Sequence, residues 1–90
     1  MSVRITWYGH ACFLFETRGQ RILVDPFLTG NPLAPVSADK VAADFILVSH
    51  GHGDHVGDTV AIARRTGALV IANFEIVTWF QSQGLQKLHA

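Results

Sequence analysis

The sequence has little that would cross-link the chain or anchor it in a membrane. Cys12 is the only cysteine among 90 residues, which excludes an internal disulfide and favours a reducing compartment. No apolar run approaches the roughly 20 residues that span a bilayer. Residues 1–6 alternate and soon meet Gly9 and His10, so they lack the continuous apolar segment of a secretory signal. We therefore expect a cytoplasmic protein with no membrane partner.

Charged residues are also scarce. They make up 16% of the chain, the net charge is zero, and Arg64 and Arg65 form the only basic cluster. Nucleic-acid binding needs a surface that neutralises phosphates, so it is not favoured. Hydrophobic residues make up 49%, which leaves too few polar side chains to cover so small a globule. We expect exposed apolar surface, to be covered by self-association through a sheet face or by a missing C-terminal half.

The apolar pattern predicts an α/β domain that opens with antiparallel strands and continues as strand, helix, strand, helix. The expected strands span 3–8, 12–16, 21–25, 44–49 and 68–72, and the expected helices span 59–66, 74–83 and, as a short element, 37–43. The alternating second half implies parallel strands with right-handed crossovers. Prolines 26, 32 and 35 predict a loop over 26–35. Residues 85–90 look like the approach to a further strand.

Several side chains have expected structural roles. Asp58 and Asn73 precede predicted helices and are expected to cap them, and Gly67 is expected to end the first of these helices. Five residues are expected in the core rather than at a substrate platform or reactive site: Cys12, Phe13, Phe15, Trp79 and Phe80.

The segment 48–58 concentrates three imidazoles and a carboxylate. His50, His52, Asp54 and His55 offer the nitrogen and oxygen donors that zinc and its first-row neighbours prefer. In an extended segment alternate side chains point the same way, so we expect the first three on one side and His55 on another, serving two neighbouring metals. The glycines between them let the backbone approach an ion.

Three acidic or imidazole groups have further candidate roles. Asp54 is a candidate to orient a metal-bound hydroxide and accept its proton, or to act as a ligand only. His10, between two predicted strands, is a candidate for contact with substrate or leaving group; the alternative is a hydrogen-bonded core histidine. Asp25, at a strand end, is a candidate to hold the far nitrogen of a ligand histidine; the alternative is a turn residue before Pro26.

The four ligand candidates match the His-x-His-x-Asp-His signature of the metallo-β-lactamase superfamily, which this sequence therefore resembles. The stretches 7–11, 24–27 and 54–58 look like the small cytoplasmic metal-dependent hydrolases of the UPF0173 type, related to ascorbate-phosphate lactonase. The resemblance implies that His50 and His52 bind one metal while Asp54 and His55 bind a second. It also implies that residues 1–90 form the N-terminal half of a four-layer αβ/βα sandwich, with the metals between its sheets.

The resemblance further implies a metal-dependent hydrolase in which metal-activated water attacks an ester, lactone, amide or phosphoester of a small-molecule substrate. Zinc is the expected ion, although manganese or iron also suits His and Asp donors. Two metals ask for about six ligands and the motif supplies four, so we expect this chain to be inactive alone and to hold about one zinc weakly.

Other functions stay open at this point. One is a non-catalytic metal-binding half-domain that needs a second half, and another is a nuclease-type member of the same superfamily. A redox role like that of flavodiiron proteins is disfavoured, because their motif has glutamate where this chain has His52. The missing export signal argues against a true β-lactamase.

Overall fold

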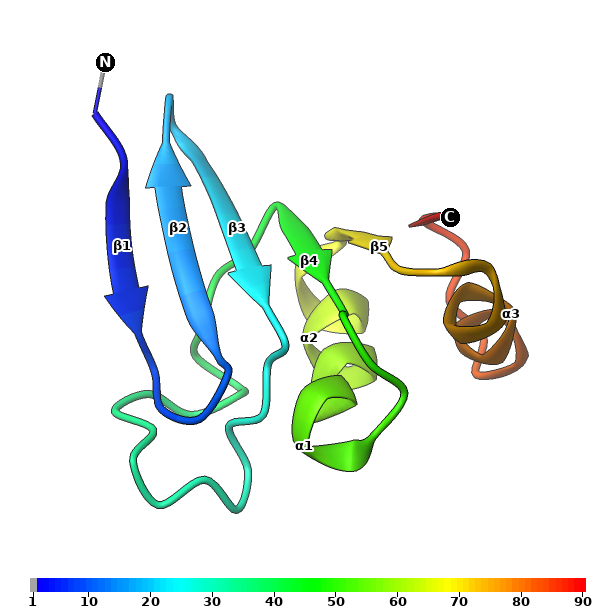
Figure 1. The fold of residues 1–90 in the computed structure, drawn as a ribbon. Coiled ribbons are helices and arrows are strands. Elements are labelled where there is room, and N and C mark those ends of the chain that lie inside the picture. Colours follow the sequence, from blue (N-terminus) through cyan, green and yellow to red (C-terminus); the bar gives the residue numbers. More distant parts are fainter. Residues whose placement is uncertain (1) are drawn as a thin grey trace.

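The computed structural model describes residues 2–90, which form one six-stranded sheet with three helices (Figure 1). The strands are β1 (Arg4–Trp7), β2 (Phe13–Thr17), β3 (Gln20–Val24), β4 (Phe45–Leu47), β5 (Leu69–Ile71) and β6 (Leu88–His89), and the helices are α1 (Gly53–Val56), α2 (Thr59–Thr66) and α3 (Phe74–Ser82). Strands lie in chain order; β1 to β3 pair antiparallel and β3 to β6 pair parallel. The predicted α/β class, antiparallel opening and parallel second half are confirmed.

The ends of the two longer helices follow from their flanking residues. Asn73 caps α3, since its side chain accepts the backbone N–H of Ile76 at 2.9 Å. Gly67 ends α2 in the left-handed conformation, with φ 74°, and donates its N–H to the carbonyl of Ala63. Both predictions are confirmed. No helix within residues 2–90 has the length and apolar character needed to cross a membrane.

The short helix predicted over 37–43 is wrong. The carbonyl of Ser37 accepts the N–H groups of Lys40 and Val41, which makes a single turn. The carbonyl of Ala38, which a helix over 37–43 would use, instead accepts the guanidinium of Arg65 from α2, which also bonds to the carbonyl of Val41. The chain from 25 to 44 is therefore one long loop held against α2.

One face of the sheet is buried. Its register aligns Leu14, Leu23, Ile46 and Val70 across β2 to β5, and each is at most 6% exposed. Ile62 of α2 and Phe80 of α3, both fully buried, join the same cluster. The predicted burial of Cys12 is confirmed as well. The core thus lies between the sheet and the helices, which gather beside β4 to β6 (Figure 1).

The opposite face of the sheet carries two rows of apolar side chains. Register aligns one row as Ile5, Phe15, Ile22, Phe45 and Leu69, and the other as Trp7, Phe13, Val24, Leu47 and Ile71. All ten are half-buried or exposed, and none belongs to the buried core. We call these ten residues the open face. The core positions predicted for Phe13 and Phe15 are therefore wrong, as is that of Trp79, which is 48% exposed on α3.

Candidate metal centre

Three segments that are distant in sequence meet at one edge of the sheet. Because β1, β3 and β4 run in the same direction, the chain leaves each of them at this edge. The connections that follow carry His10, Asp25 and the segment 49–55. The N–H of Asp25 donates to the carbonyl of Leu47 at 2.8 Å, which ties the end of β3 to that of β4. The parallel pairing thereby brings the candidate site residues together.

Asp25 is a buried carboxylate at this edge, 3% exposed. Its Oδ1 accepts the backbone N–H of Ser49 at 2.7 Å, and its Oδ2 accepts the Ser49 hydroxyl at 2.5 Å and Nδ1 of His55 at 2.9 Å. Donor atoms of Asp25, His50 and His55 also lie within 4.8 Å of one another. Both oxygens of Asp25 are already engaged, however, so its geometry is that of a group that orients Ser49 and His55.

These bonds determine which ring nitrogen of two histidines carries the proton. An ionised carboxylate only accepts, so the Ser49 hydroxyl donates to Asp25, and its oxygen accepts Nδ1–H of His50 at 2.8 Å. His55 likewise donates its own Nδ1–H to Asp25. In both rings Nε2 keeps its lone pair, the form in which a neutral imidazole binds a metal. One buried carboxylate thus presets two histidines, one directly and one through Ser49.

Asp54 lies between His10 and His55. Nε2 of His10 donates to Oδ2 of Asp54 at 2.8 Å, and Oδ1 of Asp54 lies 3.9 Å from Nε2 of His55. Two donors that each sit about 2.1 Å from one ion are about 3 to 4.2 Å apart, so this pair suits a shared cation. The hydrogen bond from His10 lowers the pKa of Asp54 from its ordinary value. This imidazole and carboxylate set fits zinc, manganese or iron.

We call residues 48–58 the ligand segment. The expectation that side chains alternate in direction along it, as in a strand, is wrong after His52. Helix α1 begins at Gly53, so Asp54 and His55 lie on a helical turn. His55 consequently belongs to both groups of close donor atoms, one with His10 and Asp54 and one with Asp25 and His50. His52 belongs to neither group; its ring is exposed and nearly parallel to that of His50, with centroids 6.3 Å apart. Its role as a ligand stays a prediction.

Asp58 is the N-cap residue of α2, as predicted, but its side chain binds the neighbouring loop and does not cap the helix. Its backbone is not extended as a cap requires, with φ −95° and ψ 18°, and its side chain makes no capping bond. Instead its carboxylate accepts the N–H groups of Leu28 and Thr29 and the Thr29 hydroxyl, at 3.1, 2.8 and 2.8 Å. Gly57 lies so close that an added Cβ would be 2.4 Å from the carbonyl oxygen of Pro26. The ligand segment and the long loop are therefore locked together.

The same loop positions His10. The ring of Phe27 meets the imidazole of His10 edge-on, with centroids 5.7 Å apart. The side-chain amide of Asn31 donates to the carbonyls of Tyr8 and Phe27, at 3.2 and 2.9 Å. His10 itself has φ 55°, in the left-handed region. The position of His10 beside Asp54 thus depends on the long loop, because Phe27 contacts its ring and Asn31 bonds to the backbone of Tyr8, two residues before it.

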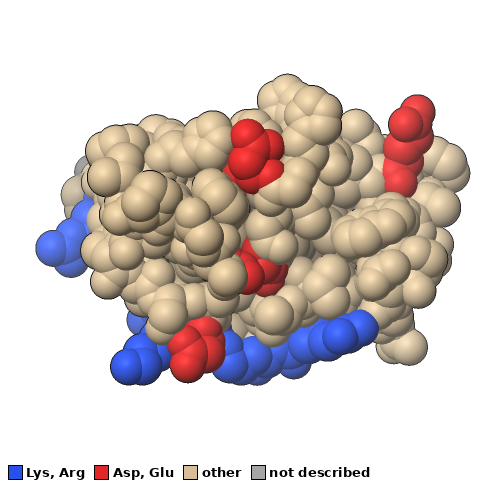
Figure 2. Space-filling view, turned by 90° about the horizontal axis from the view of Figure 1, so that it is seen from below, with Lys and Arg blue, Asp and Glu red and all other residues tan. Residues whose placement is uncertain are grey.

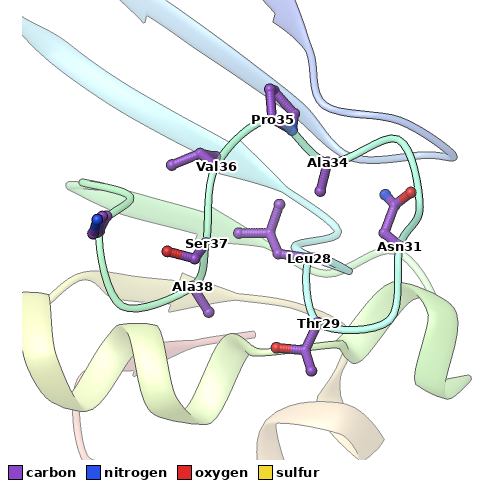
Figure 3. Close-up of a pocket in the computed structure, with 9 residues that line it drawn as sticks. Leu28, Thr29, Asn31, Ala34, Pro35, Val36, Ser37 and Ala38 are labelled. Atoms are coloured by element: carbon purple, nitrogen blue, oxygen red, sulfur yellow. The ribbon is translucent and has the colours of Figure 1, made fainter.

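The surface at this edge suits a cation better than a polyanion. Lys and Arg side chains lie along one side, while the middle shows acidic and uncharged residues (Figure 2). A hollow of about 490 Å³ inside the long loop is lined by no candidate ligand (Figure 3). A second hollow, of about 370 Å³, adjoins the ligand segment at Gly51 and Gly53 and is walled by Val56, Ile76 and Trp79.

The comparison with known families agrees with this geometry. A family model described as the beta-lactamase superfamily domain matches residues 4–87. The chain belongs to the beta-lactamase superfamily. The resemblance drawn from the His-x-His-x-Asp-His motif is thereby confirmed, and with it the metal-dependent hydrolase group within that superfamily, as the individual relatives show.

Relatives from this superfamily are named UPF0173 metal-dependent hydrolases. One from Shouchella clausii is 53% identical over 87 residues, covering 97% of this chain and 38% of the relative. One from Carboxydothermus hydrogenoformans is 56% identical over 84 residues, covering 93% and 37%. The solved structure of Igni18, a metallo hydrolase from Ignicoccus hospitalis, superposes with a TM-score of 0.87 at 35% identity, covering 98% and 39%. This chain spans less than two fifths of the length of these superfamily members.

Sequence reasoning missed two residues of this superfamily site. Ser49 was read only as the end of a buried strand, yet it connects Asp25 to His50. A hydroxyl immediately before the first histidine of the motif was the available signal. Phe27, which contacts His10, carried no comparable signal, because only the folded loop brings them together.

Proposed function

We propose that this chain provides the metal-binding side of a hydrolase that uses activated water to cleave an ester, lactone, amide or phosphoester bond in a small molecule. The observation that supports this most is the Asp25 network. It leaves Nε2 of His50 and His55 free for a metal, next to the carboxylate of Asp54. Supporting carboxylates of this kind orient ligand histidines and raise their basicity.

The residues proposed to hold metal are His50, His52, Asp54 and His55. Zinc is the ion we propose first, with manganese and iron suited to the same donors. When bound, such an ion lowers the pKa of a water molecule to about 7 and polarises the bond to be cleaved. Because these four side chains fall short of the roughly six that a two-metal site requires, we propose that residues 1–90 hold about one ion.

Asp54 and His10 have distinct proposed roles. The hydrogen bond from His10 lowers the pKa of Asp54 and so favours its ionised form, the form in which the carboxylate would bind an ion or accept a proton from the attacking water. The His10 bond to Oδ2 also orients that carboxylate. The His10 side chain is 43% exposed, so it remains accessible to a substrate or leaving group.

The test is hydrolysis by a chimaera in which these 90 residues replace the matching part of the Shouchella clausii hydrolase. The zinc- or manganese-loaded chimaera is offered a panel of ester, lactone, amide and phosphoester substrates. Asp54→Ala and His52→Ala are each expected to lower turnover about a hundredfold or more, because each removes a proposed ligand. The control is Asp39→Ala, which removes an exposed carboxylate outside the site. Turnover retained in both site variants would contradict the proposal.

A further inference from the structure

A hollow of about 370 Å³ opens between the ligand segment and α3, on the helix side of the sheet and away from the open face. Ile76, one of its walls, belongs to the buried core, and Val56 packs against that core. Trp79 of α3 forms a further wall and is 48% exposed. Small-molecule sites are hollows of this size, mostly apolar with a few polar groups. The hollow therefore has the dimensions and the lining of a ligand site.

Two glycines place this hollow directly beside the proposed metal ligands. Gly51 and Gly53 line it, and they flank His52 in the chain. A Cβ added to Gly51 would lie 3.9 Å from Cγ1 of Ile76, and one added to Gly53 would meet nothing within 4 Å. The absence of side chains at both positions thus keeps the hollow open. Consecutive Cα atoms are about 3.8 Å apart, so the hollow begins within one residue of His52 and Asp54.

The charge around the hollow disfavours anionic ligands. Among the described residues that line it, only Glu75 is charged, and its side chain is exposed. A carboxylate or phosphate in the hollow would face the Glu75 carboxylate, with no lining Lys or Arg to offset the repulsion. Uncharged and cationic groups meet no such cost. Because solvent and salt screen an exposed charge, the discrimination should be severalfold and strongest at low ionic strength.

We propose that the hollow binds an uncharged apolar group of the substrate, such as a phenyl ring, and that Trp79 is the residue that determines this specificity. The indole offers a flat surface on which a ring stacks or meets edge-on. A group held there keeps the neighbouring bond of the substrate beside the ligand segment, which favours reaction by position. This inference rests on the proposed hydrolase and narrows its substrates to molecules with an aromatic or branched apolar group near the bond that is cleaved.

The first test measures binding to the metal-free 90-residue chain, so it does not depend on hydrolysis. Benzyl alcohol, which is uncharged, and benzoate, which is anionic, are titrated separately against the ¹⁵N-labelled chain. With benzyl alcohol the amides of Gly51 and Gly53 and the indole N–H of Trp79 should shift saturably, with a dissociation constant on the order of 1 to 10 mM. Benzoate should bind about threefold more weakly, and Glu75→Gln should remove that difference. Trp7, on the open face, is the internal reference and should not shift in parallel.

Three substitutions in α3 separate the hollow from the rest of the helix. Trp79→Ala removes the proposed wall and should weaken benzyl alcohol binding about fivefold or more, as followed at the glycine amides. Trp79→Phe keeps an aromatic wall and should bind within about threefold of wild type. Phe74→Ala is the matched control, because Phe74 is also an exposed aromatic residue of α3 but does not line the hollow. It should leave binding unchanged.

The second test measures specificity in the Shouchella clausii chimaera, with whichever class of substrate it cleaves. A substrate that carries a phenyl group next to the scissile bond is compared with its methyl counterpart. Trp79→Ala should lower kcat/KM for the phenyl substrate about tenfold and leave the methyl substrate within about twofold. Glu75→Gln should leave both values unchanged and raise kcat/KM for a 4-carboxyphenyl substrate about threefold.

The two proposals fail in different ways. A chimaera that cleaves no substrate of the panel would overturn the proposed hydrolase, and the substrate proposal with it, even if benzyl alcohol binds. An active chimaera whose preference for phenyl over methyl is unchanged in folded Trp79→Ala would overturn the substrate proposal alone. Glycine amides that do not shift with benzyl alcohol, or that shift equally in wild type and Trp79→Ala, would have the same effect.

Discussion

Asp25→Asn should weaken metal binding although it changes a single atom of the side chain. Asparagine has nearly the same shape and tolerates the φ of 45° found at this position. Its amide oxygen can still accept the Ser49 N–H. Its NH₂ group, however, donates where the carboxylate accepted, so Nδ1 of His55 must accept and the ring proton moves to Nε2. The Ser49 hydroxyl now accepts from the amide and donates to His50, which moves that ring proton as well.

The expected loss follows from the number of ligands affected. Both histidines would present an N–H to the ion instead of a lone pair. Loss of one partner that supports a ligand typically weakens metal affinity ten- to hundredfold, or about 1.4 to 2.7 kcal/mol. We expect at least the upper end here, because one substitution reverses two rings. Asp25→Ala would differ, since it removes the side chain that accepts the Ser49 N–H and hydroxyl and would therefore lower folding stability as well as metal affinity.

The assay is competition for zinc with a chromophoric chelator, combined with ¹⁵N NMR of the imidazoles to identify the protonated nitrogen. Asp39→Asn is the matched control. Asp39 also accepts a serine hydroxyl at 2.5 Å, from Ser37, but it is exposed and remote from the imidazoles. Its substitution should leave zinc affinity within a factor of two. The reasoning is refuted if Asp25→Asn binds zinc as tightly as wild type, or if His55 keeps its proton on Nδ1.

Three further outcomes are expected. In a zinc titration followed by calorimetry, the 90-residue chain should take up about one equivalent, and tight uptake of two would contradict the ligand count. Burial raises the pKa of Cys12 from 9.0 to about 12, so the folded thiol should resist thiol reagents below that pH. The folding stability that the neutral thiol contributes should be complete below about pH 9 and decline toward pH 12. Rapid labelling of the folded chain at pH 8 would contradict this prediction. In urea unfolding, Phe80→Ala should lower the free energy of unfolding by about 3 to 5 kcal/mol, because Phe80 is fully buried. Phe74→Ala, at a site 74% exposed, should lower it by less than about 0.5 kcal/mol. Equal losses would contradict the described core.

The periodic patterns of apolar residues and the helix-capping residues were enough to predict most of the fold. The strand pattern, the helix that ends at Gly67 and the cap at Asn73 were predictable because each depends on residues within a few positions of one another. The helix predicted over 37–43 does not form, and Arg65, more than twenty residues later, bonds to the Ala38 carbonyl that such a helix would use. The local pattern could not include that competitor.

The site was predictable in its chemistry and less so in its geometry. The motif named the donor groups, and Asp25 was already a candidate for supporting a ligand histidine. The turn of helix after His52 was not expected, and it changes which donors lie together. Asp58 shows the same limit: its position before a helix suggested a cap, but loop N–H groups from residues 28 and 29 occupy its carboxylate.

The contacts that join residues 57–58 to residues 26–29 constrain how this protein can be redesigned. Because Asp58 bonds to residue 29 and Gly57 lies against residues 26 and 27, lengthening the chain within residues 26–29 would displace the imidazoles. The span 32–36 lies between the Asn31 bonds and the turn that begins at Ser37, and its ends are secured independently. Extra residues in such a surface span add little to the entropic cost of closing the loop. The length of the span 32–36 can therefore be varied while the imidazoles keep their positions.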